Sequence, residues 1–259
     1  MKVDVLLDSF GTTWTDILDA AKAAEELGLD GVWLNDHLSG WVERAPHVLE
    51  CWTLLSALAS TVPRVVLGPL VLNVANRDAG TLAVMAATLQ EVSGGRLMLG
   101  TGAGGRSGTR YALEQEALGR TVASDPKRRL AVERTVQTVR QVWSGGATGK
   151  GGFLRPTPPP PMLIAAFGPK MAELAGTIGD GICVQAGTRL PELVSIAREA
   201  RARVGRDPRT FLVAATLGTV PEQTQKWAEL DVDRLVVYVG PPFEVGIRQL
   251  AAVSHDRTS

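Results

Sequence analysis

The residues with the clearest capacity for chemistry follow a short apolar run, Gly31–Leu34. Asp36 and His37 are adjacent, and Trp41 stands four residues beyond His37. An imidazole beside a carboxylate can give or take a proton near neutral pH, and an indole offers a flat apolar face for a ring to stack on. These three residues are therefore candidate catalytic residues. The alternative is a loop in which Asp36 and His37 make structural hydrogen bonds only.

Such a loop needs a scaffold, and the sequence predicts a barrel. Eight apolar runs are predicted to be strands, centred near residues 3, 32, 66, 98, 163, 182, 213 and 236, and each is followed by a helical pattern. Successive β-then-α units in a chain of about 250 residues are typical of a (β/α)8 barrel. We therefore expect an α/β fold with one TIM-barrel domain over residues 1–259. An open, doubly wound sheet is the alternative.

The predicted helices carry apolar residues at helical spacing. In Thr81–Val92, for example, Leu82, Met85 and Leu89 share one face, and the glycines that follow end the helix. The other predicted helices cover Trp14–Leu27, Leu49–Thr61, Pro126–Trp143, Pro169–Ile178, Pro191–Val204, Glu222–Leu230 and Phe243–Val253. Ser107–Ser124 is less regular. Ala147–Pro161, rich in Gly and then Pro, is predicted to be neither helix nor central strand.

In a barrel of this type, the loops after the strands meet at one rim and form the active face. These loops are Asp8–Thr13, Asn35–His47, Leu72–Asp78, Thr101–Gly108, Phe167–Lys170 and Gln185–Arg189. The Asp36-His37 pair is thus predicted to share a rim with a Gly-rich loop and with two later loops that open helices.

Composition narrows the classes of partner. Lys and Arg together number 27, as do Asp and Glu, so the formal net charge is zero and nothing favours a nucleic-acid partner. No apolar run has the roughly 20 residues of a membrane span, so we expect no membrane association. Cys51 and Cys183 are predicted to be buried, reduced thiols, which suits a cytoplasmic protein. The histidines lack metal-ligand spacing and no metal is expected; a site from Asp36, His37 and His47 is the alternative.

Four motifs, in order, resemble the bacterial-luciferase-like family of flavin- and deazaflavin-dependent oxidoreductases. They are GLDGVWLNDHL at 28–38, VVLGPLVLN at 65–73, EVSGGRLMLGTGAGG at 91–105 and PPPMLIAAFGPKMAELAGTIGDGICVQAG at 159–187. The resemblance implies a TIM barrel with a redox ring bound on the active face. Many members have a long late insertion that forms a lid, but here only a short connection separates Thr216 from Glu222.

In the deazaflavin-using branch, the resemblance places His37 as proton donor or acceptor and Trp41 against the ring or substrate. It also implies a non-prolyl cis peptide bond between Leu70 and Val71, bulging toward the ring, with Asn73 as a donor to a ring carbonyl. An ordinary strand and a turn-capping Asn73 are the alternatives.

The Gly-rich loop, with Gly102, Ala103 and Gly104, would line the cofactor's ring or tail. That loop often holds a Glu in the deazaflavin branch, where the acid takes part in sugar-phosphate oxidation. This chain has Ala103 and Gly104 there. The departure argues against transferring that activity to the chain.

A phosphate site is predicted at two later loops. Glycines lead into the helices that begin near Pro169 and Pro191, and free N–H groups at helix N-termini bind phosphate. With the resemblance, the candidates are Gly168, Gln185, Gly187, Thr188 and Arg189. Helix capping alone is the alternative.

Together these features predict an F420-dependent reductase or dehydrogenase. It would transfer a hydride between the deazaflavin and a C=C or C=N bond of a small-molecule substrate, such as a natural-product intermediate. An FMN-dependent monooxygenase is the first alternative, and a cofactor-free binding barrel the second. The resemblance further implies a homodimer formed through the early helices.

Overall fold

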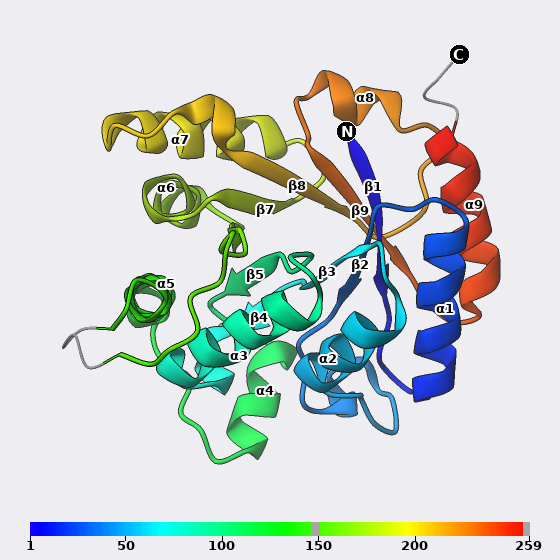
Figure 1. Ribbon diagram of the computed structural model, residues 1–259, viewed down its shortest axis with the longest axis horizontal. Helices are drawn as coiled ribbons and strands as arrows, with labels where there is room; N and C mark the ends of the chain where they lie inside the picture. The colour runs from blue at the N-terminus through cyan, green and yellow to red at the C-terminus, as the bar shows by residue number, and fades with distance from the viewer. Residues whose placement is uncertain (147–150, 256–259) are drawn as a thin grey trace.

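A computed structural model describes residues 1–146 and 151–255 of the chain. Within them, parallel strands form a single sheet around a central axis (Figure 1). The strands are β1 (Lys2–Leu7), β2 (Gly31–Leu34), β3 (Val66–Pro69), β4 (Leu72–Asn73), β5 (Leu99–Gly102), β6 (Met162–Ala165), β7 (Gly181–Gln185), β8 (Leu212–Leu217) and β9 (Arg234–Val239). All eight predicted strands are confirmed, and the predicted one near residue 66 is split into β3 and β4.

The sheet closes into a barrel because β3 and β4 are two pieces of one barrel strand. The strand order is β3-β2-β1-β9-β8-β7-β6-β5-β4, so the ends of the sheet are the two pieces. A parallel bridge joins Leu67 of β3 to Leu97, just before β5, and so completes the ring: the Leu67 N–H donates to the Arg96 carbonyl at 3.0 Å, and the Met98 N–H donates to the Leu67 carbonyl at 2.9 Å. The predicted (β/α)8 barrel is therefore confirmed.

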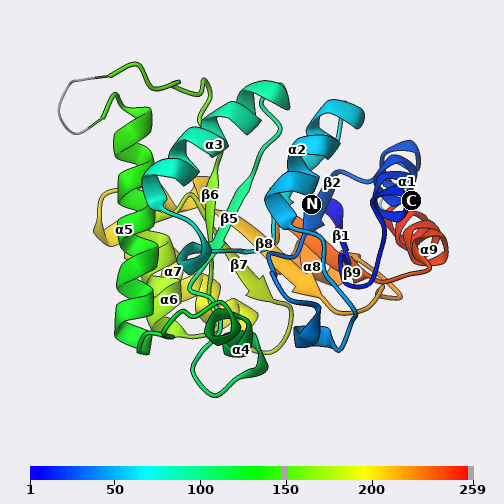
Figure 2. The same ribbon diagram turned by 90° about the horizontal axis from the view of Figure 1, so that it is seen from below.

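Helices surround the strands (Figures 1 and 2). They are α1 (Trp14–Glu26), α2 (Cys51–Thr61), α3 (Ala79–Val92), α4 (Arg110–Ala117), α5 (Asp125–Trp143), α6 (Pro169–Ile178), α7 (Leu190–Arg203), α8 (Gln225–Glu229) and α9 (Phe243–His255), with short 3-10 helices η1 (Gly40–Glu43), η2 (Val74–Asn76) and η3 (Pro208–Thr210). None of these helices within the described residues is long and apolar enough to cross a membrane.

Helix α4 is the main difference from the prediction, which left Ser107–Ser124 irregular. Helix α4 is short and lacks a side-chain hydrogen bond at its N-cap, Thr109, so the local sequence contains only a weak signal for a helix. Of the predicted irregular segment Ala147–Pro161, residues 147–150 lie outside the described residues. Residues 151–161 form neither helix nor strand, as predicted, and lead into β6. Both cysteines are free and buried, as predicted.

Side chains alternate between the barrel wall and its interior. On β1, Val3, Val5 and Leu7 are fully buried among the surrounding helices, whereas Asp4 is buried on the other face. Both oxygens of Asp4 accept hydrogen bonds from Arg234, at 2.6 and 2.7 Å. Burying a charge requires such pairing, so this ion pair closes the interior near the start of the strands.

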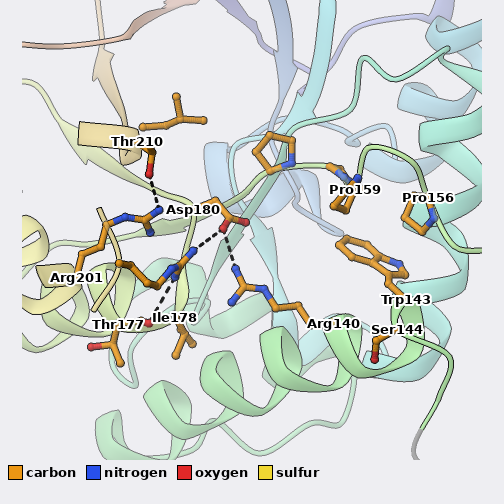
Figure 3. A pocket seen from close by; sticks show the side chains of 14 residues that line it. Arg140, Trp143, Ser144, Pro156, Pro159, Thr177, Ile178, Asp180, Arg201 and Thr210 are labelled. Carbon is orange, nitrogen blue, oxygen red and sulfur yellow. Dashed lines mark hydrogen bonds and ion pairs between the residues drawn. The ribbon is translucent and has the colours of Figure 1, made fainter. Parts of the chain in front are cut away.

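A cavity of about 800 Å³ lies at the amino-terminal ends of β6, β7 and β8 (Figure 3). At its centre, Asp180 accepts hydrogen bonds from Arg140 at 2.9 Å and from Arg206 at 2.8 Å. Arg201 and Arg206 also donate to the Gly179 carbonyl, just beyond α6. The arginines thus tie α5, the end of α6 and the region after α7 to the barrel. Although large, this cavity lies at the end opposite the predicted active face, where barrel residues serve stability.

The packing of α6 against α7 gives a testable prediction, because these helices begin at the predicted phosphate loops. A Cβ added to Gly176 of α6 would meet the Ala197 carbonyl oxygen of α7. We expect Gly176→Ala to lower the free energy of unfolding by about 1–3 kcal/mol in urea denaturation, despite the better helix propensity of Ala. Gly218→Ala is the control, since an added Cβ there has no described protein atom within 4 Å. Equal stability of the two variants would contradict this close approach.

Candidate active site

A cavity of about 280 Å³ opens at the carboxyl-terminal ends of the strands. Its wall comes from the loop after β2, the segment Leu70–Asn73, the ends of β5 and β6 with the loops that follow them, and side chains of α4, α5 and α6. The lining residues are Asp36, His37, Leu70, Val71, Asn73, Gly102, Ala103, Gly104, Gly105, Tyr111, Glu114, Arg128, Ala165, Phe167 and Met171. The structure therefore brings together eight of the residues that the sequence singled out.

His37, directly after β2, is held on three sides. Its Nδ1 lies 3.2 Å from Oε2 of Glu114, its ring stacks on Tyr111 at 5.8 Å between centroids, and Phe10 approaches at 5.3 Å. The side chain is 21% exposed, so the imidazole remains accessible from the cavity. This arrangement suits a residue that exchanges a proton with a bound molecule.

Asp36 does not pair with His37, in contrast to the expectation from their adjacency. Its buried carboxylate accepts two hydrogen bonds from Arg77, at 2.9 and 2.8 Å, and one from the Asn73 N–H at 2.8 Å. Neighbouring residues in extended backbone point to opposite sides, so Asp36 and His37 find different partners. Asp36 therefore joins the loop after β2 to the loop after β4.

Arg77 extends this network to α2. It also donates to Glu50, which is the N-cap of α2 and accepts hydrogen bonds from the N–H groups of Trp52 and Thr53. Burial raises the pKa of the Glu50 carboxyl, but the hydrogen bonds from Thr53 and Trp52 and the Arg77 charge outweigh burial, and the net pKa is lowered. Two carboxylates on one guanidinium hold the rim of the barrel together.

The floor of the cavity contains the break between β3 and β4. The Leu70–Val71 peptide bond is cis, which confirms that prediction. Val71 packs in the barrel interior with Leu163, Ala165 and Cys183. A Cβ on Gly102 would meet Val71 at 2.6 Å, so this glycine, the last residue of β5, makes room for the Val71 side chain.

The rest of the Gly-rich loop is also shaped by protein contacts. Arg128 of α5 donates to the carbonyls of Ala103 and Gly104, and Gly104 adopts a positive φ of 70° next to Asn73. Oδ1 of Asn73 accepts the Ala75 N–H, so Asn73 caps η2, the alternative considered above. The NH₂ group of its amide remains available as a donor to a ligand.

A second cavity, of about 290 Å³, adjoins the first along Phe167, which lines both. It contains the predicted phosphate residues Gln185, Gly187, Thr188 and Arg189. The N-caps of α6 and α7, Gly168 and Arg189, make no side-chain capping hydrogen bond. An added Cβ on Gly168 or Gly187 would have no described protein atom within 4 Å, so space is open beside both helix N-termini.

Trp41 is the candidate that the structure places apart. It lies on η1, its residue is 65% exposed, and it is not among the lining residues of either cavity. The aromatic rings nearest to the His37 imidazole are those of Phe10 and Tyr111. Stacking by Trp41 on a ring in the cavity thus has no support in this geometry.

The sequence reasoning missed Arg77, Tyr111, Glu114 and Arg128. Tyr111 and Glu114 are three residues apart, the spacing that brings two side chains to one helix face, but α4 itself was not predicted. Arg77 and Arg128 are ordinary cations in sequence, and no local pattern tells which carbonyl or carboxylate they reach.

Comparison with known proteins agrees with this geometry. A family model described as luciferase-like monooxygenase matches residues 2–256. The chain belongs to the luciferase-like monooxygenase family.

Among relatives of this luciferase-like chain is the F420-dependent hydroxymycolic acid dehydrogenase of Mycobacterium tuberculosis, 32% identical over 220 residues, which are 80% of this chain and 59% of that enzyme. The F420-dependent glucose-6-phosphate dehydrogenase of Amycolatopsis mediterranei is 32% identical over 184 residues, 66% of this chain and 54% of that enzyme. The luciferase-like chain thus spans little more than half the length of these relatives. An F420-dependent secondary alcohol dehydrogenase, solved with an F420-acetone adduct, has the same fold, with a TM-score of 0.82, 18% identity and 97% of each chain covered.

The buried Asp36–Arg77 pair yields a prediction about stability. Arg77→Met leaves the fully buried Asp36 carboxylate without its cation, which should cost about 3–5 kcal/mol of unfolding free energy. The double variant Asp36→Asn/Arg77→Met should be more stable than Arg77→Met alone, because the fully buried charge is then removed and only the more exposed Glu50 carboxylate lacks Arg77. Urea denaturation of both, with Asp36→Asn as control, measures this. A double variant that is no more stable than Arg77→Met would contradict the role of the pair.

Glu50 yields a prediction about pH. Because its folded pKa lies below the usual value of 4.5, its contribution to stability is present above that pH and is lost as the pH falls through the folded pKa. We expect Glu50→Gln to lower the free energy of unfolding by about 1 kcal/mol at pH 7, the size of a helix cap. Denaturation at several pH values should show the gap to wild type narrowing below pH 4.5. A gap that stays constant down to pH 3 would contradict this linkage.

Proposed function

We propose that this chain is an F420-dependent oxidoreductase that transfers a hydride between the deazaflavin and a C=C or C=N bond of a small organic molecule, such as a natural-product intermediate. One observation carries the proposal. An accessible imidazole, that of His37, faces a cavity with apolar surface from Leu70 and Val71, and this cavity adjoins a second one beside the N-terminus of α7. Catalytic roles for Asp36 and Trp41 have weaker support, since Asp36 is bound to Arg77 and Trp41 lies outside the cavity.

The residues present fit the two ends of such a cofactor. A deazaflavin has a flat ring and, through a chain, a phosphate ester. Leu70, Val71 and Ala165 supply apolar surface for the ring, and the Asn73 NH₂ group can donate to a ring carbonyl. Thr188, Arg189 and the N–H groups of Lys170 and Glu192, in the first turns of α6 and α7, would hold the phosphate. The two adjoining cavities correspond to these two ends.

When bound, the deazaflavin supplies or accepts the hydride at a ring carbon. A C=C or C=N bond that gains a hydride also needs one proton, and His37 is the group placed to deliver it. In the opposite direction His37 accepts the proton that the substrate loses. Phe10 and Tyr111 on either side of the ring fix its orientation, which is the condition for efficient proton transfer.

The F420-dependent dehydrogenases among the relatives and solved structures support the choice of F420 and of dehydrogenase or reductase chemistry. Substrate is a separate matter. The Gly-rich loop has Ala103 and Gly104 where the deazaflavin branch of the family often has a Glu that takes part in sugar-phosphate oxidation. We therefore propose a substrate other than a sugar phosphate.

An FMN-dependent monooxygenase is the second candidate, favoured by the description of the family itself. Such chemistry needs a closed, dry pocket to protect its oxygen adduct. The connection from β8 at Leu217 to α8 at Gln225 is short and offers no long lid. A cofactor-free binding barrel is the third candidate, and the retained His37 speaks against it. We also propose a cytoplasmic homodimer that pairs through α2 and α3. Val84 and Val92 of α3 are exposed and could lie in such an interface.

Calorimetric titration of the pure protein with F420 and, separately, with FMN tests the proposal. We expect F420 to bind and FMN to bind at least tenfold more weakly. Thr188→Ala/Arg189→Ala should raise the Kd for F420 by about tenfold or more, because charge-assisted hydrogen bonds to the phosphate are lost. Arg203→Ala, an exposed arginine near the other end of α7, is the matched control.

Preferential binding of FMN would move the assignment to the monooxygenase. Failure of both cofactors to bind would revive the binding barrel. An unchanged Kd in the double variant would place the phosphate elsewhere.

A further inference from the structure

A carboxylate of helix α4, that of Glu114, contacts His37 in the candidate active site. Glu114 is 3% exposed, and its Oε2 lies 3.0 Å from the Leu38 N–H and 3.2 Å from Nδ1 of His37. Tyr111, three residues earlier on the same helix, stacks on the His37 ring. One face of α4 therefore makes two different contacts with one imidazole.

The Gly-rich loop allows α4 to come this close. A Cβ on Gly105 would collide with the main chain of Tyr111, so α4 rests directly on the loop at that position. Outside the cavity, Arg110 pairs with Glu43 of η1 at 2.8 Å, and Gln115 donates to Asn76. Helix α4 is thus fastened to its surroundings on both sides of Glu114.

The contact between Glu114 and His37 has a direction. Oε2 of Glu114 accepts the Leu38 N–H, a group that can only donate, so this oxygen is an acceptor. Glu114 as a carboxylate has no hydrogen to donate, so the ring nitrogen that faces the same oxygen carries the hydrogen. A neutral imidazole carries hydrogen on one of its two nitrogens. A hydrogen-bond acceptor beside one nitrogen holds the hydrogen there, and the other nitrogen is then an acceptor.

We propose that Glu114 is a positioning residue for His37. It holds the proton of the neutral imidazole on Nδ1 and leaves Nε2 free to exchange a proton with a substrate in the cavity. Helix α4, not the Gly-rich loop with its Ala103 and Gly104, then provides the carboxylate of the site. The catalytic consequence rests on the proposed function; the location of the proton on His37 does not.

The first test needs no cofactor. Imidazole ¹⁵N chemical shifts of the full chain, labelled at histidine and recorded at a pH where the ring is neutral, report which nitrogen carries hydrogen. His37→Gln assigns the His37 signals. We expect wild type to show hydrogen on Nδ1 of His37. A wild-type spectrum with hydrogen on Nε2 alone would overturn the proposal.

Variants of Glu114 then separate positioning from packing. Glu114→Ala should shift the His37 tautomer away from Nδ1–H, whereas Glu114→Gln, which keeps an acceptor oxygen, should largely preserve it. Glu116→Gln, an exposed glutamate on the same helix, is the matched control and should leave the spectrum unchanged. A His37 tautomer that is the same in wild type and in Glu114→Ala would overturn the proposal. If Glu114→Ala does not fold, the spectra of wild type and Glu114→Gln still test it, because both should show hydrogen on Nδ1 of His37.

Turnover with bound deazaflavin gives the second test. His37→Ala should cost about 10²–10⁴-fold in kcat, the range of general acid–base catalysis. Glu114→Ala should lower kcat by part of that factor, with Glu114→Gln partly rescued, and Glu114→Ala added to His37→Ala should cost nothing more, because Glu114 acts through His37. Additive losses would overturn the positioning role. If no hydride transfer is found at all, the proposed function is wrong. The ¹⁵N spectra still test the location of the proton on His37, because that measurement needs no cofactor.

Discussion

The rim of this barrel depends on one buried ion pair, that of Asp36 with Arg77. The Asp36 carboxylate is fully buried and accepts hydrogen bonds from both Arg77 and the main chain of Asn73. Through Arg77 the same network reaches Glu50 at the start of α2. A buried charge without its partner costs several kcal/mol, so the connection from β2 to α2 and the segment after β4 must keep one relative position. The cavity wall that carries His37 inherits that rigidity.

Helix α4 completes the wall, and glycine makes this possible. The glycines at the end of β5 and beyond it resemble a ligand-binding loop, yet three of them face protein atoms: Gly102 faces Val71, Gly104 faces Asn73, and Gly105 faces the main chain of Tyr111. Because no Cβ intervenes, the cis-linked segment and α4 both approach the loop closely. The side chains that orient His37 are therefore supplied by a neighbouring helix, which suits a site whose chemistry needs a fixed imidazole.

The two ends of the barrel divide the tasks. At the amino-terminal ends of the strands, Asp180 with Arg140 and Arg206 forms a charged network that ties helices to the barrel (Figure 3). At the carboxyl-terminal ends, the helix N-termini at Gly168 and Arg189 remain uncapped by side chains and face open space. Satisfied polar groups stabilise, whereas unsatisfied N–H groups at a helix start are available to an anion.

The sequence by itself determined the barrel, since hydrophobic periodicity and helix-ending glycines are local signals that survive without tertiary contacts. It also located His37, the loops of the active face and, through family resemblance, the cis Leu70–Val71 bond. Only the tertiary structure decided that Glu114 rather than Asp36 meets His37, that Arg77 binds Asp36, and that Trp41 lies outside the cavity. These pairings join residues about 40 to 80 positions apart, and the partner of a long polar side chain depends on where the closed barrel places it, which no local pattern encodes.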